Sequence, residues 1–137
     1  MGIDPGTRRV GVAIGHTGTG IATPYEVWPR RGEPSLVTRL RACVAEWEAE
    51  RVVMGLPRGL DGSDGPAAQA ARGLAAELEA GVGVPVELHD ERFSTVTAQA
   101  SLQRGGLDTR RSRKVVDAVA AAVILQSWLD TDRTERP

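Results

Sequence analysis

The sequence of 137 residues contains little cysteine, almost no lysine and few aromatic residues. Its single cysteine, Cys43, excludes an internal disulfide and fits a reducing cytoplasm. No apolar run reaches the roughly 18–20 residues that a membrane-spanning helix needs, and the N-terminus lacks the pattern of a secretory signal. These absences argue against a disulfide-stapled secreted domain and a transmembrane protein. We therefore expect a cytoplasmic protein that does not bind a membrane.

Arginine supplies nearly all of the positive charge. Lys114 is the only lysine, so sixteen of the seventeen cations are arginines, and the net charge is −1. Acids concentrate at 46–50 and 77–79, whereas basic residues gather in predicted turns and helix starts, namely Arg8, Arg9, Arg104, Arg110, Arg111, Arg113 and Lys114. Despite the nearly neutral total, this segregation is compatible with an anionic partner.

Apolar periodicity predicts one domain over residues 1–130, with a polar tail at 131–137. Two N-terminal strands form a hairpin around the turn 5–9, and an edge strand follows at 20–29. Two buried strands are expected at 51–57 and 85–91. Helices are expected at 34–47, at 66–80 with a stop at Gly81, at 94–105 and at 112–129.

This order of elements predicts an α/β fold built on a mixed five-stranded sheet flanked by helices. The first three strands form an antiparallel meander, and the last two strands are parallel. Ligands of such sheets gather outside the carboxyl ends of the parallel strands. Asp4, Arg58, Asp90 and Glu91 all lie at predicted strand ends. We therefore expect these four side chains at one edge of the sheet.

Asp117 stands inside the apolar run KVVDAVAAAVIL. An unpaired carboxylate in apolar surroundings costs several kcal/mol, so Asp117 requires a partner. One interpretation is structural, namely a salt bridge to Arg113 or Lys114 or an exposed stripe on the helix. The alternative is functional, because the small Ala120 and Ala121 on the same helix face would let this helix approach the ends of the first and last strands.

The functional interpretation brings Asp4, Glu91 and Asp117 together from distant parts of the chain. Three neighbouring carboxylates repel one another and are stable mainly around a divalent cation. Oxygen ligands without a cysteine and histidine set favour Mg²⁺ or Mn²⁺ over zinc. Such ions activate water for phosphodiester hydrolysis, while flanking arginines hold the phosphate backbone. With so few aromatic residues, recognition would depend on backbone charge and shape more than on base identity.

Four segments in this order resemble the signature segments of the YqgF family, also called RuvX: GIDPGTRRVGVA, GLPRGLDGSDGP, DERFSTVTAQ and VVDAVAAAVILQSWL. That family is described as Holliday-junction-resolvase-like or as pre-16S rRNA nucleases. The resemblance covers about residues 1–129. It implies a ribonuclease-H-like fold, a metal-dependent endonuclease and a role in maturing the 5′ end of 16S ribosomal RNA, with ribosomal precursor particles as candidate partners.

The resemblance also assigns roles to individual residues. Asp4 matches the family's first acid, Glu91 the second and Asp117 the third, and Asp90 is a reserve for the second. The three matched acids would be the catalytic residues and the metal ligands. The expected substrate-binding residues are Thr7, Arg8, Arg9, Arg58, Arg92, Ser94, Thr95, Arg113 and Lys114.

Three rival functions are considered. An actin-like ATPase shares the D-x-G-T hairpin, but that fold needs two lobes and several hundred residues. A DNA resolvase acting on four-way junctions would use the same acids as a homodimer, and the sequence decides neither between RNA and DNA nor between monomer and homodimer. A noncatalytic ribosome-assembly factor would bind nucleic acid without cutting it.

Several other residues have ordinary structural interpretations beside functional ones. Asp61 and Asp64 are expected as turn residues that cap the next helix, with a substrate-facing loop as the alternative. His89 is expected to face its neighbours in a strand, with proton transfer as the alternative. Trp47 and Trp128 are expected in or near the core.

Overall fold

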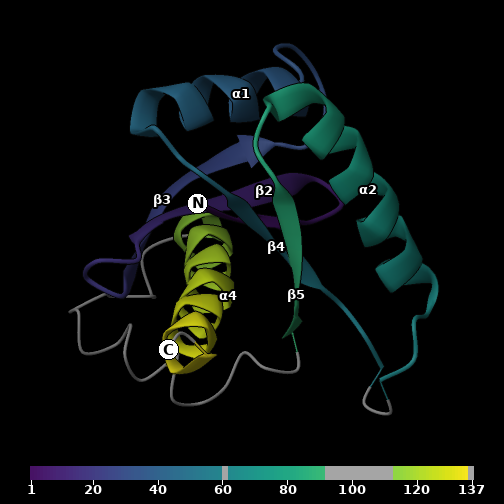
Figure 1. Ribbon diagram of the computed structural model, residues 1–137. Coiled ribbons are helices and arrows are strands. Elements are labelled where there is room, and N and C mark those ends of the chain that lie inside the picture. Colours follow the sequence, from purple (N-terminus) through teal and green to yellow (C-terminus); the bar gives the residue numbers. More distant parts are fainter. Residues whose placement is uncertain (60–61, 92–112, 136–137) are drawn as a thin grey trace.

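The computed structural model describes residues 1–59, 62–91 and 113–135, and a five-stranded sheet forms its centre (Figure 1). The strands lie in the order β3-β2-β1-β4-β5. β1 pairs antiparallel with β2 and β2 with β3, whereas β1 with β4 and β4 with β5 are parallel pairs. This arrangement confirms the predicted mixed sheet. The strands are β1 (Gly2–Pro5), β2 (Arg9–His16), β3 (Ile21–Pro29), β4 (Val52–Leu56) and β5 (Val86–Asp90).

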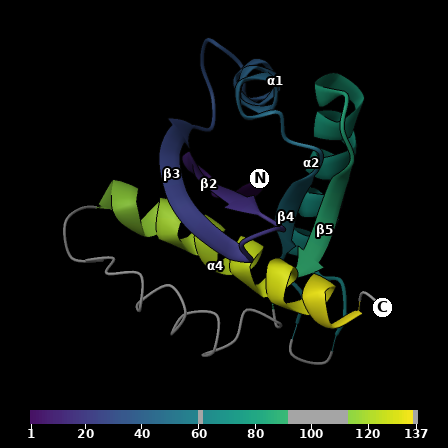
Figure 2. The same ribbon diagram turned by 60° about the vertical axis from the view of Figure 1, so that its left-hand side comes forward.

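Helices cover both faces of the sheet. α1 (Leu36–Trp47) and α2 (Pro66–Val82) pack on one face, and α4 (Arg113–Glu135) crosses the other (Figure 2). α1 begins at Ser35, whose hydroxyl accepts a hydrogen bond from the backbone N–H of Thr38 and caps the helix. None of the described helices combines the length and apolar character needed to cross a bilayer.

The face under α1 and α2 is filled by large apolar side chains. Because side chains alternate across a strand, every second residue of β1, β2 and β4 points to this face. Ile3, Val10, Val12 and Met54 are fully buried there, together with Leu40 of α1. This cluster is the larger of the two cores.

The face under α4 is lined by glycine and alanine instead. Ala13 and Val53 are buried there against Ala121 of α4. The glycines of this face leave no room for a side chain, because an added Cβ would contact or overlap α4 or a side chain beside it; they are Gly2, Gly11, Gly15 and Gly55. α4 therefore lies directly on the backbone of the sheet.

Two helix ends differ from the prediction. α2 continues past Gly81 to Val82, and Gly83, with a φ of 81°, forms its C-terminal cap. Gly81 serves helix packing instead of helix termination, because Val37 of α1 lies against it and Arg41 donates a hydrogen bond to its carbonyl. The predicted stop at Gly81 was therefore two residues early.

α4 also extends to Glu135, beyond the predicted end at Leu129. The additional turn is supported by Thr131, whose hydroxyl donates to the carbonyl of Ser127, and by a hydrogen bond from Gln126 to Asp130. Trp128 is buried as predicted, whereas Trp47 is 41% exposed and makes an edge contact with Tyr25. The short helix predicted at 94–105 lies outside the described residues.

Candidate active site at the carboxyl ends of the strands

Strand alternation determines which acids share a face of the sheet. Asp4 lies two residues beyond Gly2 on β1, so it faces α4. Glu91 also faces α4, and its carboxylate lies over Gly55. Asp90 follows Leu88 on the opposite face, where it is buried and lies 3.6 Å from Arg58. The structure therefore brings Glu91 to Asp4 and turns Asp90 away.

Two glycines make room for the side chains beside Asp4. Gly11 of β2 is the register partner of Asp4, and the backbone carbonyl of Asp117 rests directly on Gly11. On the other side, Ile3 pairs with Met54, so Gly55 is the next residue of β4 beside Asp4. Asp4 thus lies between Gly11, which the backbone of Asp117 contacts, and Gly55, which the carboxylate of Glu91 contacts.

The carboxylates of this cluster interact electrostatically. Burial raises the pKa of Asp4, and the nearby charge of Asp117 raises it further. Burial also raises the pKa of Glu91, with additional contributions from the charges of Asp4 and Asp90. Asp4 therefore lies within electrostatic reach of Asp117 and of Glu91 despite their distance in sequence.

Asp117 has a partner that the sequence did not suggest. Its Oδ2 accepts a hydrogen bond of 2.6 Å from Nε of Arg9, at the start of β2. Both side chains are partly exposed, 43% for Arg9 and 32% for Asp117. Arg9 was expected to bind substrate, and the expected salt-bridge partners of Asp117 were Arg113 and Lys114. Only the backbone of those two residues is described.

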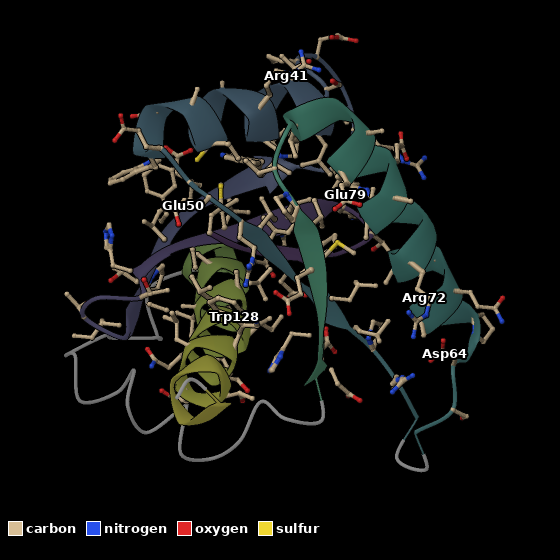
Figure 3. The ribbon with its side chains drawn as sticks, in the orientation of Figure 1. Arg41, Glu50, Asp64, Arg72, Glu79 and Trp128 are labelled. Carbon is tan, nitrogen blue, oxygen red and sulfur yellow. The ribbon has the colours of Figure 1, made fainter. Side chains whose placement is uncertain are left out.

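A second charged cluster lies on the face covered by α2. Asp64 accepts hydrogen bonds from Nε of Arg58 at 2.9 Å and from Nε of Arg72 at 2.7 Å. Figure 3 shows Asp64 and Arg72 near the start of α2. Arg58 also reaches Asp90, so these residues form the chain Arg72–Asp64–Arg58–Asp90. The hydrogen bonds from Arg72 and then Arg58 lower the pKa of Asp64. Asp64 thus holds two arginines together.

The remaining predicted residues fall in three groups. Thr7 and Arg8 are exposed in the turn between β1 and β2, beside Asp4. His89 is buried, its Nε2 lies 2.9 Å from the Ser127 hydroxyl, and burial lowers its pKa. Asp61, Arg92, Ser94 and Thr95 lie outside the described residues.

The acids suit a divalent cation in their chemistry but not fully in their arrangement. All three offer carboxylate oxygens, and their mutual repulsion is an imbalance of charge that a cation would relieve. Within the described ranges, however, no three histidine, cysteine, aspartate or glutamate side chains form a group that could hold a metal ion. Asp117 is engaged by Arg9 instead.

Sequence reasoning missed the glycines that position this site. Gly11 and Gly55 are interior residues of strands, where glycine signals close approach of another backbone or group. Gly11 lies within the motif GIDPGTRRVGVA, and Gly55 begins GLPRGLDGSDGP. Their positions within strands could have indicated a close approach, although not which element approaches.

Comparison with known proteins gives a match over nearly the whole chain. A family model described as "RuvX: Holliday junction resolvase" matches residues 1–131. A relative from Anaeromyxobacter dehalogenans (strain 2CP-C) is 44% identical over 95% of both chains. One from Streptomyces coelicolor is 44% identical over 97% of this chain and 80% of the relative, and one from Mycobacterium ulcerans is 46% identical over 98% and 79%. All three are named as candidate pre-16S rRNA nucleases.

Solved structures share the fold at lower sequence identity. Thermus thermophilus RuvC superposes with a TM-score of 0.57 at 19% identity, covering 96% of this chain and 95% of that chain. A second structure, of T. thermophilus RuvC in complex with a Holliday junction substrate, gives the same TM-score and identity over 98% and 94%. These values confirm the predicted fold class.

Proposed function

Because this chain belongs to the RuvX family, whose model is described as Holliday junction resolvase, we propose that it is a metal-dependent endonuclease that processes the 5′ end of pre-16S rRNA. The names of the bacterial relatives support RNA as the substrate. The observation that carries the proposal is the position of Asp4 on the α4 face, between Gly11, which the backbone of Asp117 contacts, and Gly55, which the carboxylate of Glu91 contacts.

Asp4, Glu91 and Asp117 are the proposed catalytic residues and the ligands of Mg²⁺ or Mn²⁺. A bound cation of this kind activates water and offsets the charge that develops on the phosphate. Asp4 is fixed by its strand at the centre of the cluster, and the carboxylate of Glu91 lies against Gly55. Asp117 arrives on α4, whose backbone rests on Gly11. Asp90 is not part of this set, because it faces Arg58 on the opposite face.

Basic and hydroxyl side chains are proposed to bind the phosphate backbone. Arg58 is among them, although it pairs with Asp64 and Asp90 on the opposite face of the sheet from Asp4. Arg8 and Thr7 are exposed in the turn beside Asp4, and Arg9 starts the next strand. Contacts of this kind position the substrate and make its affinity fall as salt rises. The complete proposed set is Thr7, Arg8, Arg9, Arg58, Arg92, Ser94, Thr95, Arg113 and Lys114.

A cleavage assay with metal and substrate arms tests the proposal. A structured RNA spanning the 5′ end of pre-16S rRNA and a four-way DNA junction are each incubated with Mg²⁺, with Mn²⁺ or with EDTA. We expect cleavage of the RNA that EDTA abolishes. Asp4→Asn and Glu91→Gln should each lower the rate at least about 100-fold, because each removes charge from the reacting centre.

Glu87→Gln is the matched control for Glu91→Gln. Glu87 lies on the same strand face, four residues before Glu91, and its exposed carboxylate pairs with Arg51. This variant should cut at the rate of the unaltered protein. If the Asp4 and Glu91 variants kept full activity, the proposed site would be wrong. An intact fold that binds RNA but never cuts it would favour the noncatalytic assembly factor.

The family description favours one second candidate, a resolvase of four-way DNA junctions. The same acids would cut DNA, but symmetric cleavage of a junction requires two active sites in a homodimer. Paired symmetric cuts in the junction, without cleavage of the RNA, would establish this alternative. Sedimentation of the protein with and without the junction would show whether the active form is the monomer or the homodimer.

A further inference from the structure

The ion pair between Arg9 and Asp117 joins two residues to which the proposed nuclease gives different roles. Arg9 is expected to bind a phosphate, and Asp117 is expected to bind a cation. In the structure the two side chains are paired with each other, because Nε of Arg9 donates a hydrogen bond of 2.6 Å to Oδ2 of Asp117. A carboxylate that is paired with a guanidinium binds a cation less strongly, because the guanidinium and the cation compete for the same oxygens.

This ion pair sets Asp117 apart from the other two acids. Among the described residues, Asp4 and Glu91 make no ion pair, whereas Asp117 is neutralised by Arg9. The same part of the chain holds no group of three side chains able to bind a metal ion. The cluster therefore lacks the free carboxylate of Asp117, and Arg9 is the residue that engages it.

The pair is built so that it can exchange partners. Both side chains are open to solvent, and exposed ion pairs contribute only about 0–1 kcal/mol. The backbone of Arg9 is fixed, because its carbonyl accepts a hydrogen bond of 2.7 Å from Gly6 and β2 begins at this residue. Only the side chain needs to move, and guanidinium groups bind phosphate oxygens as readily as carboxylates.

We propose that Arg9 is a positioning residue that exchanges Asp117 for a substrate phosphate and thereby couples substrate binding to metal binding. In the free protein Arg9 holds Asp117. When a phosphodiester takes the guanidinium of Arg9, the carboxylate of Asp117 becomes available to the cation beside Asp4 and Glu91. This inference rests on the proposed function, because it assumes that the three acids form the metal site.

Linkage makes the proposal measurable without catalysis. If phosphate and Asp117 compete for Arg9, each of phosphate and cation must raise the affinity of the other by the same factor. Mn²⁺ binding is measured by electron paramagnetic resonance of the free ion, with and without dimethyl phosphate at constant ionic strength. In the unaltered protein we expect dimethyl phosphate to tighten Mn²⁺ binding about fivefold. This factor corresponds to the free energy of an exposed ion pair at the upper end of the range for such pairs.

Arg9→Gln should tighten Mn²⁺ binding about fivefold in the absence of dimethyl phosphate and should lose the additional gain on adding it. Arg30→Gln is the matched control, because it removes the same charge beside the same turn from a residue that contacts Gly6 instead of Asp117. It should keep the response to dimethyl phosphate. Arg9→Lys keeps the charge and serves as a second variant if Arg9→Gln folds poorly; its shorter, single ammonium should weaken the coupling.

Two outcomes would overturn the exchange. If Arg9→Gln and Arg30→Gln bound Mn²⁺ equally well and responded equally to dimethyl phosphate, Arg9 would have no specific role, and the proposed nuclease site would stand without it. If Mn²⁺ bound to none of the proteins, Arg9→Gln included, the metal site itself would be wrong. The two failures are therefore distinguishable.

Discussion

The two faces of the sheet achieve burial in opposite ways. Under α1 and α2, branched and long side chains fill the space between helix and sheet, with Ile3, Val12 and Leu40 fully buried. Under α4, glycines remove the side chains of the sheet, so the backbone of α4 reaches Gly11, while side chains reach Gly15 and Gly55. The first face resembles the filled interior of an ordinary domain, in which lost atoms leave cavities. The second face combines a smaller apolar cluster with a direct contact between the α4 backbone and Gly11.

The two faces therefore differ in how far their contacts can adjust. A core of flexible side chains can adjust by a few tenths of an ångström, but a backbone carbonyl resting on a glycine cannot move without moving its helix. Asp117 belongs to the rigid contact, since its own carbonyl lies on Gly11 and Asp4 is paired with that same Gly11. The α1 and α2 face contains the larger apolar cluster, and the α4 face holds the backbone of Asp117 against the sheet beside Asp4.

Removing atoms from the filled face should have the largest effect on stability. Leu40→Ala leaves a cavity at a fully buried position of α1, and we expect it to lower the free energy of unfolding by about 2–5 kcal/mol. Chemical denaturation measures the loss. Val116→Ala, the same kind of truncation at an exposed position of α4, should change stability by less than about 0.5 kcal/mol. Equal losses in the two variants would show that α1 does not carry the core.

Adding an atom should be the damaging change on the α4 face. The new Cβ of Gly11→Ala would overlap the Asp117 carbonyl, and we expect a loss of about 1–3 kcal/mol together with loss of Mn²⁺ binding, because Asp117 moves with its helix. Thermal melting and Mn²⁺ titration of the folded variant measure both. The control is Gly73→Ala in α2, where the Cβ meets nothing within 4 Å. It should raise stability by up to about 1 kcal/mol.

Gly55→Ala separates backbone contact from side-chain contact on this same face. Its Cβ would meet Oε1 of Glu91 at 2.5 Å and Cδ1 of Ile124 at 2.8 Å, both at the ends of flexible side chains. Stability should therefore fall less than in Gly11→Ala, while displacement of the Glu91 carboxylate still weakens Mn²⁺ binding. A larger loss of stability in Gly55→Ala would contradict the assignment of the rigid contact to Gly11.

The fold was predictable because its signals are local. Apolar runs ended by proline or glycine marked the strands, and the order of elements implied the mixed sheet that the structure contains. The errors are also local: Gly81 was assigned as a helix stop because the contact with Val37 of α1, which explains this glycine, is absent from the local sequence. The helix extension to Glu135 depends on polar side-chain bonds that hydrophobic periodicity does not detect.

The site was predictable in composition and less so in arrangement. The puzzle of a carboxylate in an apolar run identified Asp117, and the small Ala121 indicated that its helix lies close to the sheet. The partner Arg9 is separated from Asp117 by 108 residues, and no local pattern links them. The choice between Asp90 and Glu91 depends on which residue points to which face, and that requires the register of β5.

The smallest expected effect is on the pH dependence of folding stability, which should have opposite signs for an acid on each face. Asp4, under α4, has a pKa raised above its ordinary value of 3.8 by burial and by Asp117. Between pH 3.8 and this higher folded pKa, the folded protein binds more protons than the unfolded chain, so stability from this group falls as pH rises. Asp64, beside α2, has a pKa lowered below 3.8 by Arg72 and Arg58, so the contribution of Asp64 to folding stability is lost as pH falls below 3.8.

In EDTA, Asp4→Asn should therefore flatten the decline of stability above pH 3.8, and Asp64→Asn should flatten the decline below it. Melting curves of both variants across this pH range measure the slopes. Added Mn²⁺ should reverse the first slope alone, because a cation favours the ionised form of Asp4 and does not involve Asp64. If both variants changed the same side of the curve, the opposite pKa shifts assigned to Asp4 and Asp64 would be wrong.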